Sequence, residues 1–290
     1  MYAMHPLVHA WGRDRMLSNA KKKCCLMAYV TLSCSLRWDN GQPYEFQRAL
    51  VTHIRANMEH SRSENDENGV TYLGDAYAKC GRLLREQGYS REAENLEIKV
   101  LDTRKRTLGV EHPHTVNAMA HLAATYQNLG KYAEAEKLEI QVLDARNRII
   151  GVEHPDTINA MENLAVTYCS LGKYTEAEEL EIQVLDARNR ILGVEHPHTI
   201  NAMGYLAETY RDLGKYTEAE KLEIEVLDAK NRIIGVEHPH TINAMANLAA
   251  TYRNLGKYTE AEKLEIQVLD AKNRILGVWI THIQSMPWRI

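Results

Sequence analysis

Apolar residues recur every three or four positions along most of the chain, which is the spacing of an amphipathic helix. One such set consists of Met119, Leu122, Ala123, Tyr126 and Leu129. It predicts a helix, here called helix A, that starts at Pro113, because a proline lacks only an N–H that the first turn does not use. Gly130 is expected to end the helix, since glycine readily adopts the left-handed conformation that follows a helix.

A second helix, helix B, is predicted to follow and to be buried on two sides. One apolar stripe comprises Ala135, Leu138, Val142, Ala145 and Ile149, and the other comprises Ile140, Leu143 and Ile150. Thr175 and Glu178 have the spacing of a capping box, which places the start of the equivalent helix near Thr175. The remaining face, which carries Glu139 and an Asp144–Arg148 pair one turn apart, is expected to face solvent.

This pair of helices repeats. Gly109, Gly151, Gly193, Gly235 and Gly277 follow one another at intervals of 42 residues (151 − 109 = 42, and likewise onward). The units span about 109–150, 151–192, 193–234 and 235–276, with a degenerate earlier unit at about 68–108. Because one helix pair cannot cover both stripes of helix B, neighbouring units must stack, which predicts an all-α solenoid.

The repeat resembles the tetratricopeptide repeat. The resemblance is carried by Leu164, Ala165, Tyr168, Gly172, Lys173, Tyr174, Glu176, Ala177 and Glu178, and the 42-residue unit with its L-G-x-x-H-P joint is similar to the kinesin light chain subtype. This resemblance implies that the helices form a right-handed superhelix. It also implies that the protein is not an enzyme and binds a protein or peptide in the concave groove of the superhelix. One departure is that Glu139, Glu181, Glu223 and Glu265 stand where the family normally has Tyr or Phe.

The array spans residues 68–278, and the sequence on either side of it does not repeat. Helices are predicted at about 21–36 and 44–61 within a helical linker region, 21–67, and an irregular tail is predicted at 279–290. Residues 1–20 resemble the end of the winged-helix part of nucleotide-binding switch proteins of the fungal-type NB-ARC/STAND (NLR-like) class. Met4 and His5 match its M-H-D motif, while Pro6 replaces the Asp. By this resemblance His5 is a remnant of a nucleotide contact, and the chain is expected to be a fragment of a longer protein.

The composition narrows the function further. The net charge of −4 and a single short basic run, Lys21–Lys23, argue against nucleic acid as a partner. The five cysteines form no CxxC pair, and no apolar run is long enough for a membrane span, so reduced thiols and a cytoplasmic location are expected. No P-loop is present, the His112-Pro113-His114 joint is interpreted as a helix start rather than a metal site, and no catalytic set is found. Neither a cofactor nor a metal is expected.

Differences between the four good units fall on one side of helix A, where the family has its groove. The candidate partner-binding residues are therefore the variable stripe and an unchanged asparagine column: Asn117, His121, Ala124, Gln127, Asn128, Asn159, Glu162, Asn163, Val166, Ser170, Asn201, Tyr205, Glu208, Arg211, Asp212, Asn243, Asn247, Ala250, Arg253 and Asn254.

Alternatives remain open for both features. The variation is interpreted either as adaptation to a ligand or as drift at exposed positions. The asparagines either clamp a peptide backbone or hydrogen-bond between repeats. Two functions fit the sequence, namely the ligand-sensing array of a STAND/NLR-like protein and a kinesin light chain-like cargo adaptor.

Overall fold

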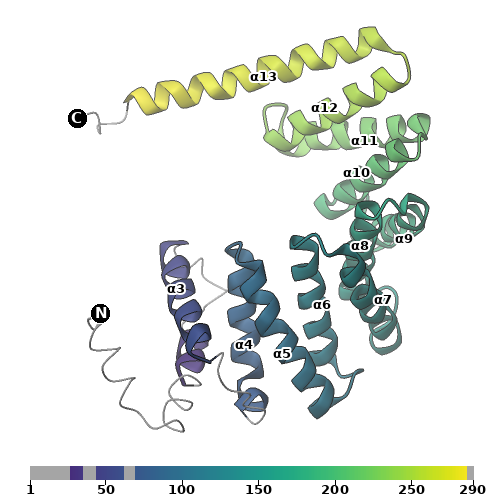
Figure 1. Ribbon diagram of the computed structural model, residues 1–290. Coiled ribbons are helices and arrows are strands. Elements are labelled where there is room, and N and C mark those ends of the chain that lie inside the picture. The colour runs from purple at the N-terminus through teal and green to yellow at the C-terminus, as the bar shows by residue number, and fades with distance from the viewer. Residues whose placement is uncertain (1–26, 35–43, 62–68, 286–290) are drawn as a thin grey trace. The chain divides into compact units, whose positions relative to one another are not determined.

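The structure is a computed structural model that describes residues 27–34, 44–61 and 69–285 (Figure 1). All regular elements in these ranges are helices, and no strand occurs among them. Residues 27–34 are helical, and α3 (Tyr44–Ser61) has the bounds that the sequence predicts. His5 and the rest of the 1–20 segment lie outside the described residues.

The chain divides into an N-terminal unit, Met1–Gly151, and a C-terminal unit, Val152–Ile290. The N-terminal unit contains α4 (Gly69–Glu86), α5 (Ser90–Leu108), α6 (Pro113–Asn128) and α7 (Tyr132–Ile149). The C-terminal unit contains α8 (Pro155–Ser170), α9 (Tyr174–Leu192), α10 (Pro197–Asp212), α11 (Tyr216–Ile234), α12 (Pro239–Asn254) and α13 (Tyr258–Ser285). Within each unit every repeat helix packs against the next one along the chain. The even-numbered helices are A helices and the odd-numbered ones from α5 onward are B helices, so the predicted all-α repeat solenoid is confirmed.

A helices start at the proline of each joint, as the sequence predicts. The cap is the preceding histidine: Nδ1 of His112 accepts a hydrogen bond from the backbone N–H of His114 at 3.2 Å. The same bond recurs in the next three units. Because this ring nitrogen is used as a cap acceptor, the joint histidines have a local structural role.

The turn from helix A to helix B depends on one glycine per unit. Gly130 has φ +71°, and the N–H groups of Gly130 and Lys131 donate to the carbonyls of Gln127 and Tyr126, which is a Schellman motif. Helix B then begins at once, at Tyr132 or Tyr174, so Thr175 is already the second residue of α9. The predicted capping box is therefore wrong, and no side chain caps this end.

The core of each 42-residue repeat lies between its A helix and its B helix. Met119, Leu122 and Ala123 are buried as predicted, and Ala135, Val142 and Ala145 of helix B are buried against them. The second predicted stripe of helix B is only partly buried: Ile140 and Ile150 are 39% and 40% exposed, whereas Leu185 and Leu227, the equivalents of Leu143, pack against the core. Ile149, which was predicted to belong to the first stripe, is also exposed, at 45%. Helix B therefore buries one broad face, and its outer face reaches solvent.

Helix α13 is longer than the other B helices. It runs for 28 residues to Ser285, through Gly277 and into the segment assigned from the sequence to an irregular tail. Elsewhere the joint glycine is followed by Val-Glu-His-Pro, in which proline starts a new helix. Here Trp279, Ile280 and Thr281 replace Glu, His and Pro, so the proline that would prevent the helix from continuing is missing.

Candidate functional site

The predicted groove residues all lie on the A helices α6, α8, α10 and α12, and each is exposed or half-buried. In the C-terminal unit some of them line one cavity of about 290 Å³ between α10 and α12. Its wall includes Asn201, Tyr205 and Glu208 from α10, Glu223 and Lys230 from α11, and His240, Asn243 and Asn247 from α12. The structure thus brings predicted residues of two successive A helices to one surface.

The asparagine column is used in two ways. Asn117 and Asn159 accept hydrogen bonds from Arg146 and Arg188 of helix B in their own repeat, at 3.3 and 3.4 Å. Asn201 and Asn243 make no side-chain hydrogen bond within the described part of the chain. Their repeats carry Lys230 and Lys272 at the position of Arg146 and Arg188. In α10 and α12 the amides are therefore free to bind a ligand.

A buried carboxylate column was missed by the sequence analysis. Glu97, Glu139, Glu181 and Glu223 are only 3–6% exposed, although helix B was expected to present this position to solvent. The carboxylate is buried because it meets a buried threonine of the next A helix: Thr125 Oγ1 donates to Glu97 Oε2. Thr209 and Thr251 hold the same positions relative to Glu181 and Glu223, and these hydroxyls oppose the rise in the pKa of the two carboxyl groups.

Burial of these carboxylates perturbs their ionisation. Desolvation raises the pKa of Glu97 to about 7, against the opposing effects of Thr125 and Arg85. It also raises the pKa of Glu181 to about 7 and raises that of Glu223. Such groups are more easily held neutral than ordinary glutamates.

Most of these carboxylates have a partner twelve residues earlier, on the A helix of the same repeat. Arg85 lies 3.1 Å from Glu97, and Arg211 lies 3.4 Å from Glu223. In the last repeat the equivalent Glu265 is exposed, and Arg253 lies 3.3 Å from it. In another repeat Gln127 donates to Glu139 at 2.9 Å. Gln127, Arg211 and Arg253 were predicted to bind a partner, and the structure gives their side chains an internal contact as well.

Two other predicted groove residues are also engaged. Arg85 donates a hydrogen bond to the backbone oxygen of His121 at 2.7 Å. The pKa of His121 is lowered to about 4, mainly by burial and to a smaller extent by the positive charge of Arg85. The carboxylate of Glu162 accepts a hydrogen bond from Arg188, whose side chain is buried in α9. Burial raises the pKa of Glu162, and Arg188 opposes that shift.

The outer face of helix B carries different ion pairs from those predicted. Arg148, Arg190, Arg232 and Arg274 do not pair with the aspartate one turn earlier but with the joint glutamates Glu111, Glu153, Glu195 and Glu237, at 2.6–3.1 Å. Each pair links the two ends of one repeat. The arginine pairs with the joint glutamate because that glutamate lies beside the last turn of helix B. The expected Asp144–Arg148 pair would require both side chains to lie along the helix.

Other kinds of site are not found in the described ranges. No cluster of three metal-ligating side chains occurs in them, and none of their helices is apolar and long enough to cross a membrane. The described cysteines Cys34, Cys80 and Cys169 are free thiols.

A family model described as "Tetratricopeptide repeat" matches the chain at residues 72–148, 115–190, 156–232 and 198–274. Together these matches span 203 of the 290 residues (274 − 72 + 1 = 203). The chain belongs to the tetratricopeptide repeat family. Members of this family are typically non-enzymatic scaffolds for protein–protein interaction.

Solved tetratricopeptide structures agree with this assignment. A Podosopora anserina protein of nearly identical TPR-like repeats, described as a kinesin light chain, is 29% identical over 71% of this chain and 97% of its own, with a TM-score of 0.63. BtubC (BKLC) from P. vanneervenii is 18% identical over 87% of this chain and 92% of its own, with a TM-score of 0.63, and shows the fold alone. A comparison with curated proteins found no match.

Proposed function

We propose that this tetratricopeptide array is a scaffold that binds an extended segment of a partner protein along the A helices of its repeats. The observation that carries the proposal is the cavity of about 290 Å³ between α10 and α12, which is lined by the unengaged amides of Asn201 and Asn243. An amide can donate to a carbonyl and accept from an N–H, so two amides on successive helices suit the backbone of an extended peptide.

The rest of the cavity provides side-chain contacts. Tyr205 is 49% exposed and supplies an aromatic surface of the kind that anchors many interfaces. Lys230 and Glu208 bring one charge of each sign, and burial lowers the pKa of Lys230. This mixture fits a polypeptide better than a small apolar ligand.

As a finer proposal, the array is the ligand-sensing part of a STAND/NLR-like switch protein. Two observations support it: the match of Met4 and His5 to the M-H-D motif, and the 29% identity to a protein with nearly identical repeats. The alternative is a cargo adaptor, which is favoured by the description of that same protein as a kinesin light chain. The genomic sequence upstream of Met1 separates the two, because a P-loop there supports the switch protein and a heptad region supports the adaptor.

Binding itself is tested with a random dodecapeptide display library selected on the whole protein. The Asn201→Ala/Asn243→Ala variant is expected to bind the recovered peptides at least about tenfold more weakly, because two backbone contacts are lost. The matched control removes two exposed amides from B helices, by Gln183→Ala/Asn273→Ala, and is expected to bind normally. Loss of binding in the control but not in the asparagine variant would place the ligand on the outer face and overturn the proposal.

A further inference from the structure

The buried carboxylate column contains one exception among the described repeats. The position twelve residues before the glutamate holds Arg85, Gln127, Arg211 or Arg253 in four repeats, and each of these contacts its carboxylate. In the repeat of Glu181 this position is Cys169. The A helix of the same repeat therefore supplies a polar or cationic side chain to every described glutamate at this position, including the exposed Glu265, except to Glu181.

Cys169 does not replace that partner. Its Sγ lies 3.4 Å from Thr209 Oγ1, and a thiol neither carries a positive charge nor reaches as far as a guanidinium. Glu181 is 6% exposed, and its buried Oε2 has no hydrogen-bond partner. The carboxylate oxygens of Glu223 also lack a hydrogen bond, but Arg211 lies 3.4 Å from Glu223, whereas Glu181 makes no ion pair within the described part of the chain. A buried carboxylate oxygen without a partner is costly, so the site is incomplete within the chain.

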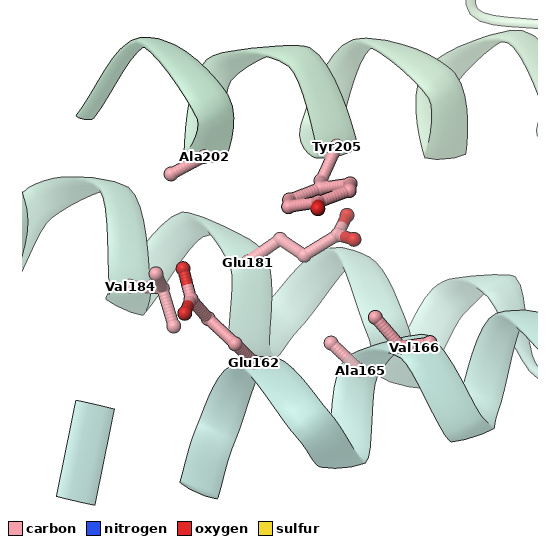
Figure 2. A pocket seen from close by; sticks show the side chains of 7 residues that line it. All are labelled: Glu162, Ala165, Val166, Glu181, Val184, Ala202 and Tyr205. Atoms are coloured by element: carbon pink, nitrogen blue, oxygen red, sulfur yellow. The ribbon is translucent and has the colours of Figure 1, made fainter. Parts of the chain in front are cut away.

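Glu181 lies at a pocket formed by α8, α9 and α10 (Figure 2). The walls are mainly aliphatic, from Ala165, Val166, Val184 and Ala202, and the ring of Tyr205 lies over the carboxyl group of Glu181. Glu162 stands on the opposite side of the pocket, but its charge is already balanced by Arg188. An aliphatic passage that ends at a buried carboxylate has the chemistry to hold the methylenes and the charged head of a basic side chain.

The space beneath Tyr205 is only about 10 Å³, enough for roughly one water molecule. A side chain can enter only if the tyrosine ring moves, and the structure provides room for this. Tyr205 also lines the cavity of about 290 Å³, and the neighbouring Gly204 has open space where a Cβ would stand. The ring can therefore turn into the larger cavity, where its face remains available to a bound cation.

We propose that Glu181 is the specificity site of the array and receives one lysine or arginine side chain of the bound partner, which supplies the cation that Cys169 does not. This inference rests on the proposed function, since the basic side chain arrives on a polypeptide that lies along the A helices. The partner thereby completes in this repeat the ion pair that Arg211 and Glu223 make within the next one.

The charges around Glu181 support this assignment. Its pKa is raised to about 7, chiefly by burial, with Thr209 opposing the rise and Glu208 and Glu178 adding to it. The other titratable groups nearby are Cys169 and Glu162 on α8, Arg188 on α9, and Tyr210 and Asp212 on α10. Because a cation binds the ionised carboxylate, binding of a basic peptide is expected to strengthen as the pH rises from 6 to 8.

The test uses the same random dodecapeptide library, selected in parallel on the wild-type protein and three variants. Glu181→Gln removes the charge with little change of shape, Cys169→Arg supplies the cation from within the chain, and Cys169→Ser is the matched control. Lys or Arg is expected at one peptide position on the wild type and on Cys169→Ser. Replacing that residue by norleucine should weaken binding to these two proteins at least about tenfold and leave binding to the other two variants nearly unchanged.

The outcomes separate this inference from the proposed function. Peptides that are recovered without a basic position, or with the same basic position on Glu181→Gln and Cys169→Arg, overturn the role of Glu181 and leave the scaffold proposal standing. Failure of every folded variant and of the wild type to recover peptides overturns both. Circular dichroism melting curves identify the variants that fold. Glu181→Gln and Cys169→Arg change different residues, so each tests the role of Glu181 separately.

Discussion

Glu181 and Glu223 occupy the same position in successive repeats (223 − 181 = 42) and are buried to nearly the same extent, but their surroundings differ in charge. Glu223 faces Arg211 at 3.4 Å, whereas Glu181 faces the neutral Cys169. The helices around both are almost identical in sequence. The repeat scaffold therefore fixes the burial of the carboxylate, and one residue twelve positions earlier decides whether its charge is balanced.

The largest effect is expected from the core that both carboxylates share. Leu206 of α10 is 3% exposed, and Leu206→Ala should lower the free energy of unfolding by about 2–5 kcal/mol, because it removes buried methyl groups and leaves a cavity. Urea denaturation followed by circular dichroism measures this loss. Leu164→Ala in the preceding repeat should cost a similar amount, and a large difference would show that the two repeats are not equivalent scaffolds.

The next effect is a dependence of stability on pH. The folded pKa of Glu181 is about 7 against an ordinary 4.5, so its stabilising contribution is complete below pH 4.5 and is lost as the pH rises through 7. That difference corresponds to roughly 3 kcal/mol at most. Glu181→Gln should therefore flatten the decline in stability between pH 5 and pH 8. Glu223→Gln should flatten it less, because Arg211 lowers the pKa of Glu223. Equal slopes in the two variants would contradict the comparison.

A third measurement removes the residue that differs. Arg211→Ala leaves Glu223 buried without its cation and should cost about 1–3 kcal/mol at pH 8, whereas Cys169→Ala should cost less than about 1 kcal/mol. The cost of Arg211→Ala should shrink at pH 5, where Glu223 can take up a proton. Thermal melts of both variants at the two pH values test this, and a cost that is independent of pH would argue against a charge effect.

The smallest effect should be the same in both repeats. Arg190 and Arg232 pair with Glu153 and Glu195 at 2.6 and 2.9 Å, but all four side chains are at least 60% exposed. Each arginine-to-alanine change should cost less than about 1 kcal/mol, because water and salt screen exposed pairs. These variants show whether the buried position alone distinguishes the repeats.

The sequence predicted the repeat architecture well because its boundaries depend on strong local constraints. The joint prolines Pro113, Pro155, Pro197 and Pro239 each begin an A helix, and Gly130 and its equivalents end it in the left-handed conformation that other residues avoid. The stacking of neighbouring repeats was predicted from the 42-residue period and from the apolar stripes of helix B. The helix continuation to Ser285 was not predicted, because Gly277 was given the same role that glycine has in the other joints.

The site was predicted less completely, for a different reason. Charged residues on a helix are normally exposed, so the column of Glu139 was placed in solvent. The burial of Glu97, Glu181 and Glu223 depends on the register between a B helix and the following A helix. The invariant threonines that match this column, such as Thr125, were the available signal, since Thr125 and Glu97 are separated by a fixed 28 residues (125 − 97 = 28) that recurs in later units. Tyr205 could be chosen because its column varies between the repeats, and Asn201 because its column is unchanged beside that stripe. No pattern in the sequence revealed which of the asparagines accept a hydrogen bond from an arginine.

The bonds between repeats also bear on how such a gene changes over time. Lys215 binds Glu178 at 2.6 Å, and Lys257 binds Glu220 through the same atoms, in both cases across 37 residues. Deletion of residues 193–234 would join Leu192 to Gly235 and set Lys257 opposite Glu178, with an unchanged partner, spacing and joint. Unequal recombination between the near-identical DNA segments would thus yield a shorter or longer array in which every junction is still a native one. Such events would change the order of Cys169-type and Arg211-type repeats without creating a new protein interface, so the gene could vary its recognition surface by copy number as well as by point mutation.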